Sequence, residues 1–213
     1  MSTVAVIDYG SSNLRSVAKA VEFVAADRHQ VIVSDRAEQI SGADRVIFPG
    51  QGAIGQCMHS LREKGLDRVI RDCIKNKPFL GICLGLQSLL DSSAEDGGTA
   101  GLGILPGKVV RFKDHVRDEH GDLCKIPHMG WNRVSHSSPH PLWNGIEDGA
   151  WFYFVHSYYA SPRNQQDVAA TTQYTVEFTS AAARDNIFAT QFHPEKSQKA
   201  GLTLLKNFLE WKI

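Results

Sequence analysis

Short apolar runs alternate with helical patterns along the first half of the chain. The runs have the length and composition of buried strands: TVAVIDY (3–9), QVIVSD (30–35), RVIFPG (45–50) and PFLGIC (78–83). Apolar residues at helical spacing follow the first run over 14–25, and two further helical patterns at 53–63 and 66–76 are separated by Gly65. Strands that alternate with helices predict a mostly parallel sheet covered on both faces.

After about residue 100 the pattern changes to strands with few helices. The candidate strands are ILPGKVVRFK, WFYFVHSYY, VAATTQYT and NIFATQFH. A last helix is expected from Ser197, because leucines recur there at helical spacing. The sequence therefore predicts one α/β domain over 1–213, with a mostly parallel sheet flanked by helices and a mixed or antiparallel, β-rich second half.

Composition and charge narrow the function classes. The 213 residues are 42% hydrophobic and 22% charged, and no apolar run approaches the roughly 20 residues that span a bilayer. The start of the chain lacks a basic, signal-like segment, so we expect a cytoplasmic protein. Lys plus Arg and Asp plus Glu both number 23, so no global basic field favours nucleic acid or a membrane surface. The four cysteines have no short paired spacing, which argues against disulfides and CxxC sites.

The segment GICLG places Cys83 between a strand and a helix, with a glycine two residues away on each side. This is the pattern of a nucleophile elbow with cysteine in place of serine. A thiol at a helix N-terminus is favoured as thiolate, and the backbone N–H of Leu84 is a candidate oxyanion donor. The alternative from this motif alone is a buried, inert cysteine.

A base for such a nucleophile is available in QFHPE. In an extended segment His193 and Glu195 would share one face, so the carboxylate could orient the imidazole. His156 is a rival base, but no carboxylate lies beside it in the sequence, which favours a packed or substrate-pocket histidine.

Other candidate sites are weaker. The spacing of His115, His120, Cys124 and His128 matches no familiar zinc pattern, so no metal is expected. The segment after residue 100 does not fit GxGxxG, and no P-loop is present, so no cofactor is expected. The two glycines of PGQG (49–52) would allow a peptide to reorient towards an anion, although, taken by themselves, they are better explained by an ordinary strand-to-helix turn.

Together, GICLGLQ, FHPEKS and the upstream PGxG resemble the class I (triad) glutamine amidotransferases, whose fold is flavodoxin-like. The blocks GILPG, PHMGWN and FVHSY narrow the resemblance to the glutaminase subunits of imidazole glycerol phosphate synthase, known as HisH. The resemblance covers essentially the whole chain. One departure is Gln51, because the family's oxyanion strand often reads PGVG.

The resemblance implies a cysteine amidase in which Cys83 attacks the side-chain amide of glutamine to form a thioester. His193 protonates the departing ammonia and then activates water, while Glu195 holds His193. The implied oxyanion donors are Leu84 and a reoriented N–H near Gln51 or Gly52. Four positions are implied to hold the substrate: Gly50, Gln87, Ser157 and Tyr158.

The implied partner is a HisF-type (β/α)8-barrel cyclase, with which the chain would form a heterodimer. The cyclase would receive ammonia through an internal channel and form imidazole glycerol phosphate and AICAR in histidine biosynthesis. Asn13, Trp131 and Lys196 are candidates for the partner-facing surface. Each has an ordinary alternative: a helix cap, a core residue and a solvated charge.

Two other functions remain open at this point. One is a related glutaminase that supplies ammonia to another synthase, for example for surface-sugar amination. The other is a catalytically silent binding module, against which the intact triad argues.

Overall fold

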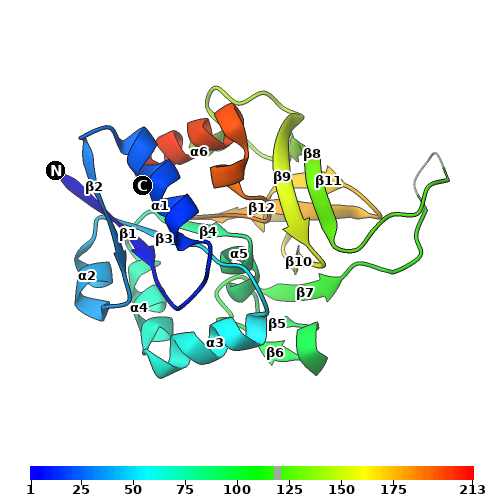
Figure 1. The fold of residues 1–213 in the computed structure, drawn as a ribbon, viewed down its shortest axis with the longest axis horizontal. Helices are drawn as coiled ribbons and strands as arrows, with labels where there is room; N and C mark the ends of the chain where they lie inside the picture. The colour runs from blue at the N-terminus through cyan, green and yellow to red at the C-terminus, as the bar shows by residue number, and fades with distance from the viewer. Residues whose placement is uncertain (118–120) are drawn as a thin grey trace.

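A large mixed sheet runs through the computed structural model, which describes residues 1–117 and 121–213 (Figure 1). In the described residues thirteen strands form this sheet, ten of them in the order β2-β1-β3-β4-β13-β12-β10-β7-β5-β6. The strands of the first half are β1 (Ser2–Ile7), β2 (His29–Ser34), β3 (Arg45–Phe48) and β4 (Phe79–Ile82). They pair in parallel, as the apolar runs predict.

Helices cover both faces of the parallel region. They are α1 (Leu14–Ala25), α2 (Ala37–Gly42), α3 (Ile54–Glu63), α4 (Leu66–Cys73), the short α5 (Leu84–Ser88) and α6 (Gln198–Glu210). Helices α1 and α6 lie against one face, and α2, α3 and α4 lie against the other (Figure 1). Alternate residues of β1 enter the two cores, with Val4 and Val6 on the side of α1 and Ala5 and Ile7 on the other.

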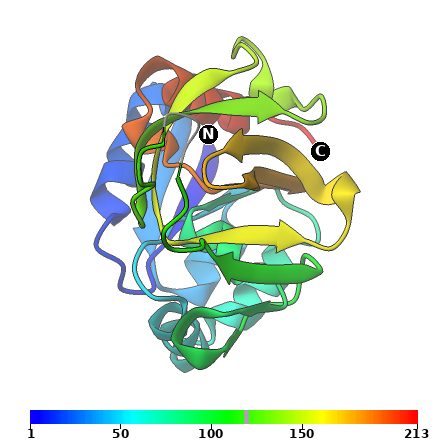
Figure 2. The ribbon, with the colours of Figure 1, turned by 90° about the vertical axis from the view of Figure 1, so that its right-hand side faces the viewer.

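The second half extends the sheet with mostly antiparallel strands, which face the viewer in Figure 2. They are β5 (Ser92–Ser93), β6 (Thr99–Ala100), β7 (Gly107–Arg111), β8 (His128–His136), β9 (Ala150–His156), β10 (Tyr158–Pro162), β11 (Val168–Gln173), β12 (Glu177–Arg184) and β13 (Ile187–Thr190). The predicted α/β class is confirmed. The pattern missed α2, β8 and β12, and the run WFYFVHSYY proves to be two strands that break at Ser157.

Strand order brings distant motifs to one edge of the sheet. Strand β4 lies between β3 and β13 and is parallel to both, with Gly81 level with Phe48 and with Ala189. The segments that leave the carboxyl ends of these three strands therefore emerge side by side, at the edge where α/β proteins place their sites. These segments carry PGQG, Cys83 and QFHPE.

No helix within the described ranges is both long and apolar enough to cross a membrane.

Candidate active site

Cys83 sits at the turn between β4 and α5 in a strained backbone conformation. Its φ is 53° and its ψ is −103°, values that residues with a Cβ rarely adopt. The side chain is 6% exposed, and the backbone N–H donates to the carbonyl of Thr190 on β13 at 2.6 Å. A strained, held turn of this kind is what a nucleophile elbow requires.

The two flanking glycines serve close packing. A Cβ at Gly85 would collide with the carbonyl oxygen of Phe48, and one at Gly81 would lie 3.0 Å from the Cβ of Ala189. Their own φ angles are not in the left-handed region, which is occupied by Cys83 itself. The glycines therefore let β3 and β13 approach the elbow, while Cys83 takes up the strain.

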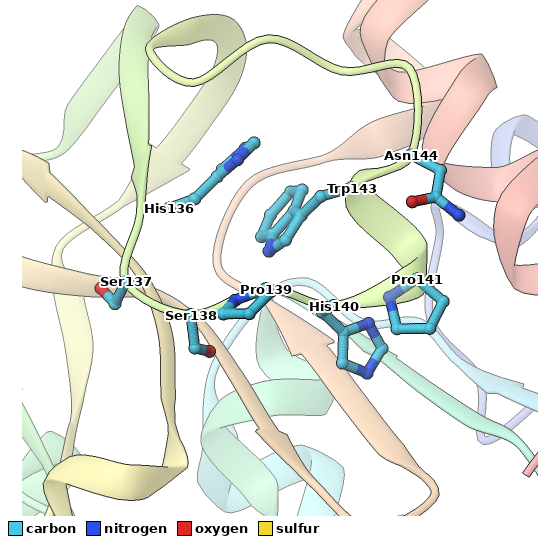
Figure 3. Close-up of a pocket in the computed structure, with 8 residues that line it drawn as sticks. All are labelled: His136, Ser137, Ser138, Pro139, His140, Pro141, Trp143 and Asn144. Carbon is cyan, nitrogen blue, oxygen red and sulfur yellow. The ribbon is translucent and has the colours of Figure 1, made fainter.

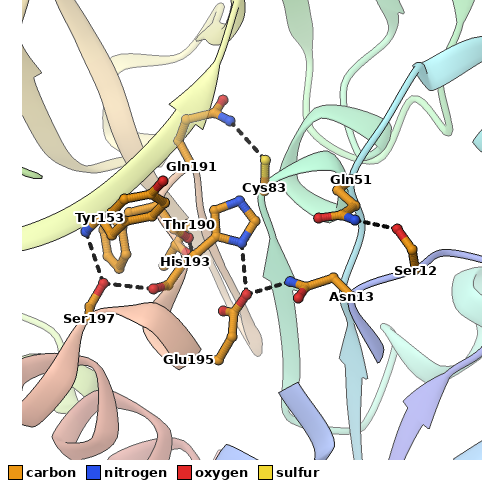
Figure 4. Close-up of polar contacts among 11 residues, drawn as sticks. Ser12, Asn13, Gln51, Cys83, Tyr153, Thr190, Gln191, His193, Glu195 and Ser197 are labelled. Atoms are coloured by element: carbon orange, nitrogen blue, oxygen red, sulfur yellow. Dashed lines mark hydrogen bonds and ion pairs between the residues drawn. The ribbon is translucent and has the colours of Figure 1, made fainter. Parts of the chain in front are cut away.

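His193 and Glu195 form a buried pair beside Cys83 (Figure 4). His193 Nδ1 lies 2.8 Å from Glu195 Oε1, and both side chains have no exposed area. The other ring nitrogen, Nε2, has no hydrogen-bond partner among the described residues and is turned towards Cys83 (Figure 4). The expected extended segment proves to be a 3-10 turn, η4 (Pro194–Lys196), yet the two side chains still meet.

Asn13 completes this group. Its Nδ2 donates to Glu195 Oε1 at 2.5 Å across 182 positions of sequence, and the residue is only 6% exposed. Asn13 occupies the N-cap position of α1 and its carbonyl accepts from the Val17 N–H, but its side chain makes no capping bond because it is bonded to Glu195.

The pKa shifts of the pair fit an imidazole whose protonation is favoured by the neighbouring carboxylate. Burial opposes protonation of His193, but its interactions with Cys83 and Glu195 outweigh this effect and raise the pKa of the imidazole. Burial likewise opposes ionisation of Glu195, but His193 and the Asn13 amide hold the pKa of its carboxyl below the usual value. The arrangement keeps Glu195 ionised and lets His193 accept a proton.

A second chain of hydrogen bonds reaches Cys83 from the opposite side. Gln87 Nε2 donates to the carbonyl of Tyr158 at 2.9 Å and to Gln191 Oε1 at 3.1 Å. Gln191 Nε2 in turn lies 3.6 Å from Cys83 Sγ (Figure 4). Gln87, expected on a solvated or substrate-facing helix position, is buried, and Gln191 was not singled out by the sequence.

The candidate oxyanion donors lie on the other flank of the elbow. The Leu84 N–H donates to the Gly50 carbonyl at 3.4 Å, so a carbonyl oxygen stands where a second donor would be needed. Gly52 has a φ of 96°, and a Cβ at Gly50 would collide with the hydroxyl of Tyr9. The Gln51 side chain donates through Nε2 to Ser12 Oγ (Figure 4).

A cavity of about 200 Å³ opens onto Cys83. It brings together seven of the residues expected from the sequence: Gln51, Gly52, Cys83, Leu84, Gln87, Ser157 and Tyr158. His156, interpreted from the sequence as a packed or substrate-pocket histidine, also lines it, and three further lining residues were not expected there: Glu95, Pro127 and Val155. Glu95 accepts from the N–H of Ile54 at 2.9 Å and supplies a carboxylate to the cavity.

His156 is part of the cavity wall and not the base. Its Nδ1 lies 2.9 Å from the Tyr158 carbonyl, and its Nε2 lies 3.0 Å from His128 Nδ1. Burial and the neighbouring His128 lower the pKa of His156 to about 3, and burial lowers that of His128 to about 4. Both rings are therefore neutral, and since a carbonyl only accepts, each donates through Nδ1.

A larger, open cavity of about 560 Å³ lies on the loop after β8 (Figure 3). Its walls include His136, whose ring stacks on that of Trp143 at 4.2 Å, and the imidazole of His140. Its lining contains neither a cysteine nor a carboxylate, so it does not offer the chemistry of the Cys83 site.

The candidate metal ligands do not form a site in the described part of the chain, where no group of three or more His, Cys, Asp or Glu could hold an ion. His128 is engaged in the aromatic core, and His120 lies outside the described residues.

The other interface candidates are accessible. Trp131 on β8 is 42% exposed and is not a core residue. Lys196 is exposed, and its Nζ lies 5.7 Å from the ring centre of Tyr153 on β9.

A strained cysteine elbow at the carboxyl edge of a parallel sheet, with a buried His–Glu pair facing it, defines a thiol-nucleophile enzyme of the triad type. Comparison with known proteins agrees. The chain matches the family "Glutamine amidotransferase class-I" over residues 5–211. It is 54% identical over its whole length to imidazole glycerol phosphate synthase subunit HisH of Methylococcus capsulatus, covering 98% of that protein. It is 56% identical to the HisH subunit of Nitrosococcus oceani, with 99% and 98% of the two chains covered.

Solved structures show the same fold at low identity. A putative GMP synthase protein from Thermoplasma acidophilum superposes with a TM-score of 0.70 at 21% identity, over 99% of this chain and 93% of that one. A glutamine amidotransferase from Thermotoga maritima gives 0.69 at 15% identity, over 98% and 96%. The chain belongs to the class I glutamine amidotransferases and, within them, to the HisH subunits of imidazole glycerol phosphate synthase.

Proposed function

We propose that the chain, as a single amidotransferase domain over 1–213, hydrolyses L-glutamine to glutamate and ammonia for an imidazole glycerol phosphate synthase in histidine biosynthesis. The observation that carries this is the group Cys83, His193 and Glu195 at one sheet edge, with a cavity beside the sulfur. The level of identity to HisH subunits supports the choice of synthase.

In the proposed reaction, the Cys83 thiol gives its proton to His193 Nε2, and the thiolate attacks the side-chain carbonyl carbon of glutamine. The C–N bond breaks as His193 returns the proton to the leaving nitrogen, so ammonia departs and a glutamyl thioester remains. Water, deprotonated by His193, then cleaves the thioester, and the thiolate leaves as glutamate forms. Glu195 stabilises the imidazolium in both steps through its bond to Nδ1.

Substrate binding follows from the lining of the cavity. The carboxylate of Glu95 suits the α-ammonium of glutamine, and the backbone around Ser157 and Tyr158 suits its α-carboxylate. Oxyanion stabilisation would come from Leu84 N–H and the reoriented peptide after Gly50, once the Gly50 carbonyl leaves the Leu84 donor.

The direct test measures glutamate release by the parent, by Cys83→Ala and by Cys124→Ala, each with the cyclase present. We expect Cys83→Ala to lose activity by at least about a thousandfold and Cys124→Ala to retain it, since Cys124 lies outside the cavity. Hydrolysis retained in a folded Cys83→Ala protein would refute the proposal.

The proposed partner is a HisF-type barrel cyclase. An exposed apolar face on the hairpin of β8 and β9 supports a docking surface: Met129 is 62%, Trp131 42% and Trp151 51% exposed. Met129 on β8 pairs with Val155 on β9, and Val155 lines the cavity. Trp131 pairs with Tyr153, whose carbonyl accepts from the His193 N–H at 2.9 Å. A partner seated there would lie next to the site where ammonia is released.

This docking surface is tested by the affinity for the cyclase from the same organism. Trp131→Ala is expected to weaken binding by about 30-fold, as for a central aromatic contact worth about 2 kcal/mol. Phe23→Ala is the matched control, because Phe23 is 73% exposed on α1. Equal affinities of the two variants would exclude the β8–β9 face, and failure of the parent to bind the cyclase would favour another synthase.

All four cysteines of the chain are free thiols, which supports a cytoplasmic location for the proposed complex.

A further inference from the structure

Gln191 is a fully buried polar side chain in contact with the candidate nucleophile. It has no exposed area, lies directly after β13 and precedes His193 by two residues. Its side-chain nitrogen is 3.6 Å from Cys83 Sγ, a normal distance for a hydrogen bond to sulfur (Figure 4). The mechanism above leaves this contact without a role.

The orientation of the Gln191 amide is fixed by its neighbours. The Tyr158 carbonyl can only accept, so the Gln87 atom 2.9 Å from it must be the amide nitrogen. That same nitrogen lies 3.1 Å from the Gln191 side chain, which must therefore present its oxygen to Gln87. It follows that the Gln191 NH2 group, and not its oxygen, faces the sulfur.

We propose that Gln191 is a further catalytic residue, whose amide N–H donates to Cys83 Sγ and stabilises the thiolate that attacks glutamine and later leaves the thioester. This inference rests on the proposed glutaminase function. The Gln191 donor also assigns a positioning role to Gln87, which holds the amide in place from α5.

A neutral donor has an advantage at this position. A hydrogen bond to an anion is about twice as strong as one to a neutral acceptor, so the contact favours the thiolate over the thiol and the thioester. His193 also faces the sulfur, but it loses its positive charge when it protonates the leaving nitrogen. The Gln191 N–H does not titrate and acts at every stage.

Several titratable groups surround the sulfur and must be considered in any pH profile. His193 and the hydroxyl of Tyr9 interact electrostatically with Cys83, and Glu195 lies behind His193. Glu95 and His156 line the same cavity. Gln191→Leu keeps all of these groups and introduces no new charge, so the alkylation profile of this variant is compared with that of the parent.

The test is the pH dependence of Cys83 alkylation by iodoacetamide in the full chain, located by peptide mapping. Gln191→Leu removes the donor, and Gln191→Glu keeps the shape and the oxygen facing Gln87 but places a carboxylate beside the sulfur. Gln166→Leu is the control, because Gln166 is exposed on the turn before β11. Circular dichroism and thermal melting establish that each variant is folded.

We expect the alkylation midpoint of Gln191→Leu to rise by about one pH unit, equivalent to about 1.4 kcal/mol, and that of Gln191→Glu to rise further. At pH 7 kcat for glutamine should fall about tenfold in Gln191→Leu with a smaller change in KM. If Gln191→Leu does not fold, the alkylation midpoint of the isosteric Gln191→Glu variant decides whether the amide N–H stabilises the thiolate.

Alkylation midpoints equal to that of Gln166→Leu would overturn the role of Gln191. If Cys83→Ala is inactive at the same time, the proposed glutaminase function stands and only this inference fails. If Cys83→Ala retains hydrolysis, the proposed function fails, whatever the alkylation profiles show.

Discussion

The bond between Gln51 and Ser12 is expected to restrain the oxyanion strand. Gln51 directly follows Gly50, whose carbonyl accepts a hydrogen bond from the Leu84 N–H. The Gln51 side chain is hydrogen-bonded to Ser12 in the loop before α1. Reorientation of the peptide after Gly50 would free Leu84 for a substrate oxyanion. Ser12→Ala or Gln51→Val removes the restraint without touching the triad.

The magnitude follows from the hydrogen bonds involved. The Leu84–Gly50 bond is long, at 3.4 Å, and contributes little. The Gln51–Ser12 bond joins two neutral groups at a partly exposed position, for which a net contribution of about 1 kcal/mol is typical. Loss of 1 kcal/mol raises the population of the reoriented peptide about fivefold, and glutamine hydrolysis without the cyclase should rise by the same factor.

The assay is steady-state glutamate release by the isolated chain at saturating glutamine. The double variant Ser12→Ala/Gln51→Val should be no faster than either single variant, because both remove the same bond. Unchanged or reduced rates in both single variants would refute the restraint. An additive effect in the double variant would show that the two side chains act independently.

Three further predictions concern the surroundings of the triad. Asn13→Leu should lower kcat/KM for glutamine by about 10- to 100-fold, because it removes a charge-assisted bond to Glu195. Asn13→Asp should lower kcat/KM further, because it places a second carboxylate beside Glu195. Parental kcat/KM in both variants would contradict a role of Asn13 in holding Glu195. His156 is neutral in the folded protein, with a pKa of about 3, and protonates near 6.5 when unfolded, so stability is lost as the pH falls. Urea unfolding measures the free energy of unfolding at pH 7 and at pH 5. Its decrease between the two pH values should be about 2 kcal/mol smaller in His156→Gln than in the parent. Equal decreases in the two proteins would contradict a neutral His156 in the folded state. Gly85→Ala should lower the free energy of unfolding by about 1–3 kcal/mol or more, because the added Cβ would collide with a backbone carbonyl oxygen. Gly42→Ala is the control and should not lower it, because no atom lies within contact distance of a Cβ at Gly42. Equal melting temperatures of the two variants would contradict the packing argument.

The parallel half of the fold was predictable because its signals are local. Each of the first four strands is a short apolar run, and PGxG and GxC each close one of them. Strand β12 gave no such signal. It reads EFTSAAAR, and small residues of low β-propensity are buried there because the strand lies between β10 and β13.

The candidate triad was predictable for a similar reason, since His193 and Glu195 are near neighbours and Cys83 sits in a recognisable turn. The roles of Asn13, Gln191 and Glu95 were not, because each depends on contacts between distant segments. Asn13 meets Glu195 across 182 positions, and Gln191 meets Cys83 across 108. A neutral amide has no sequence signature that separates such a contact from a surface position.

Strand β8 was missed because its pattern is inverted, and this inversion carries functional information. Its inward positions include His128 and Asn132, whose polar atoms are hydrogen-bonded to each other and to neighbouring strands. Its outward positions include Met129 and Trp131, which are exposed. A strand that turns apolar residues to solvent and buries histidine is unfavourable for an isolated chain and reasonable for one that docks on a partner. The same inversion places the His128–His156 pair behind the Tyr158 carbonyl, which also accepts from Gln87. One strand therefore connects the proposed docking surface to the hydrogen bonds that end at Cys83.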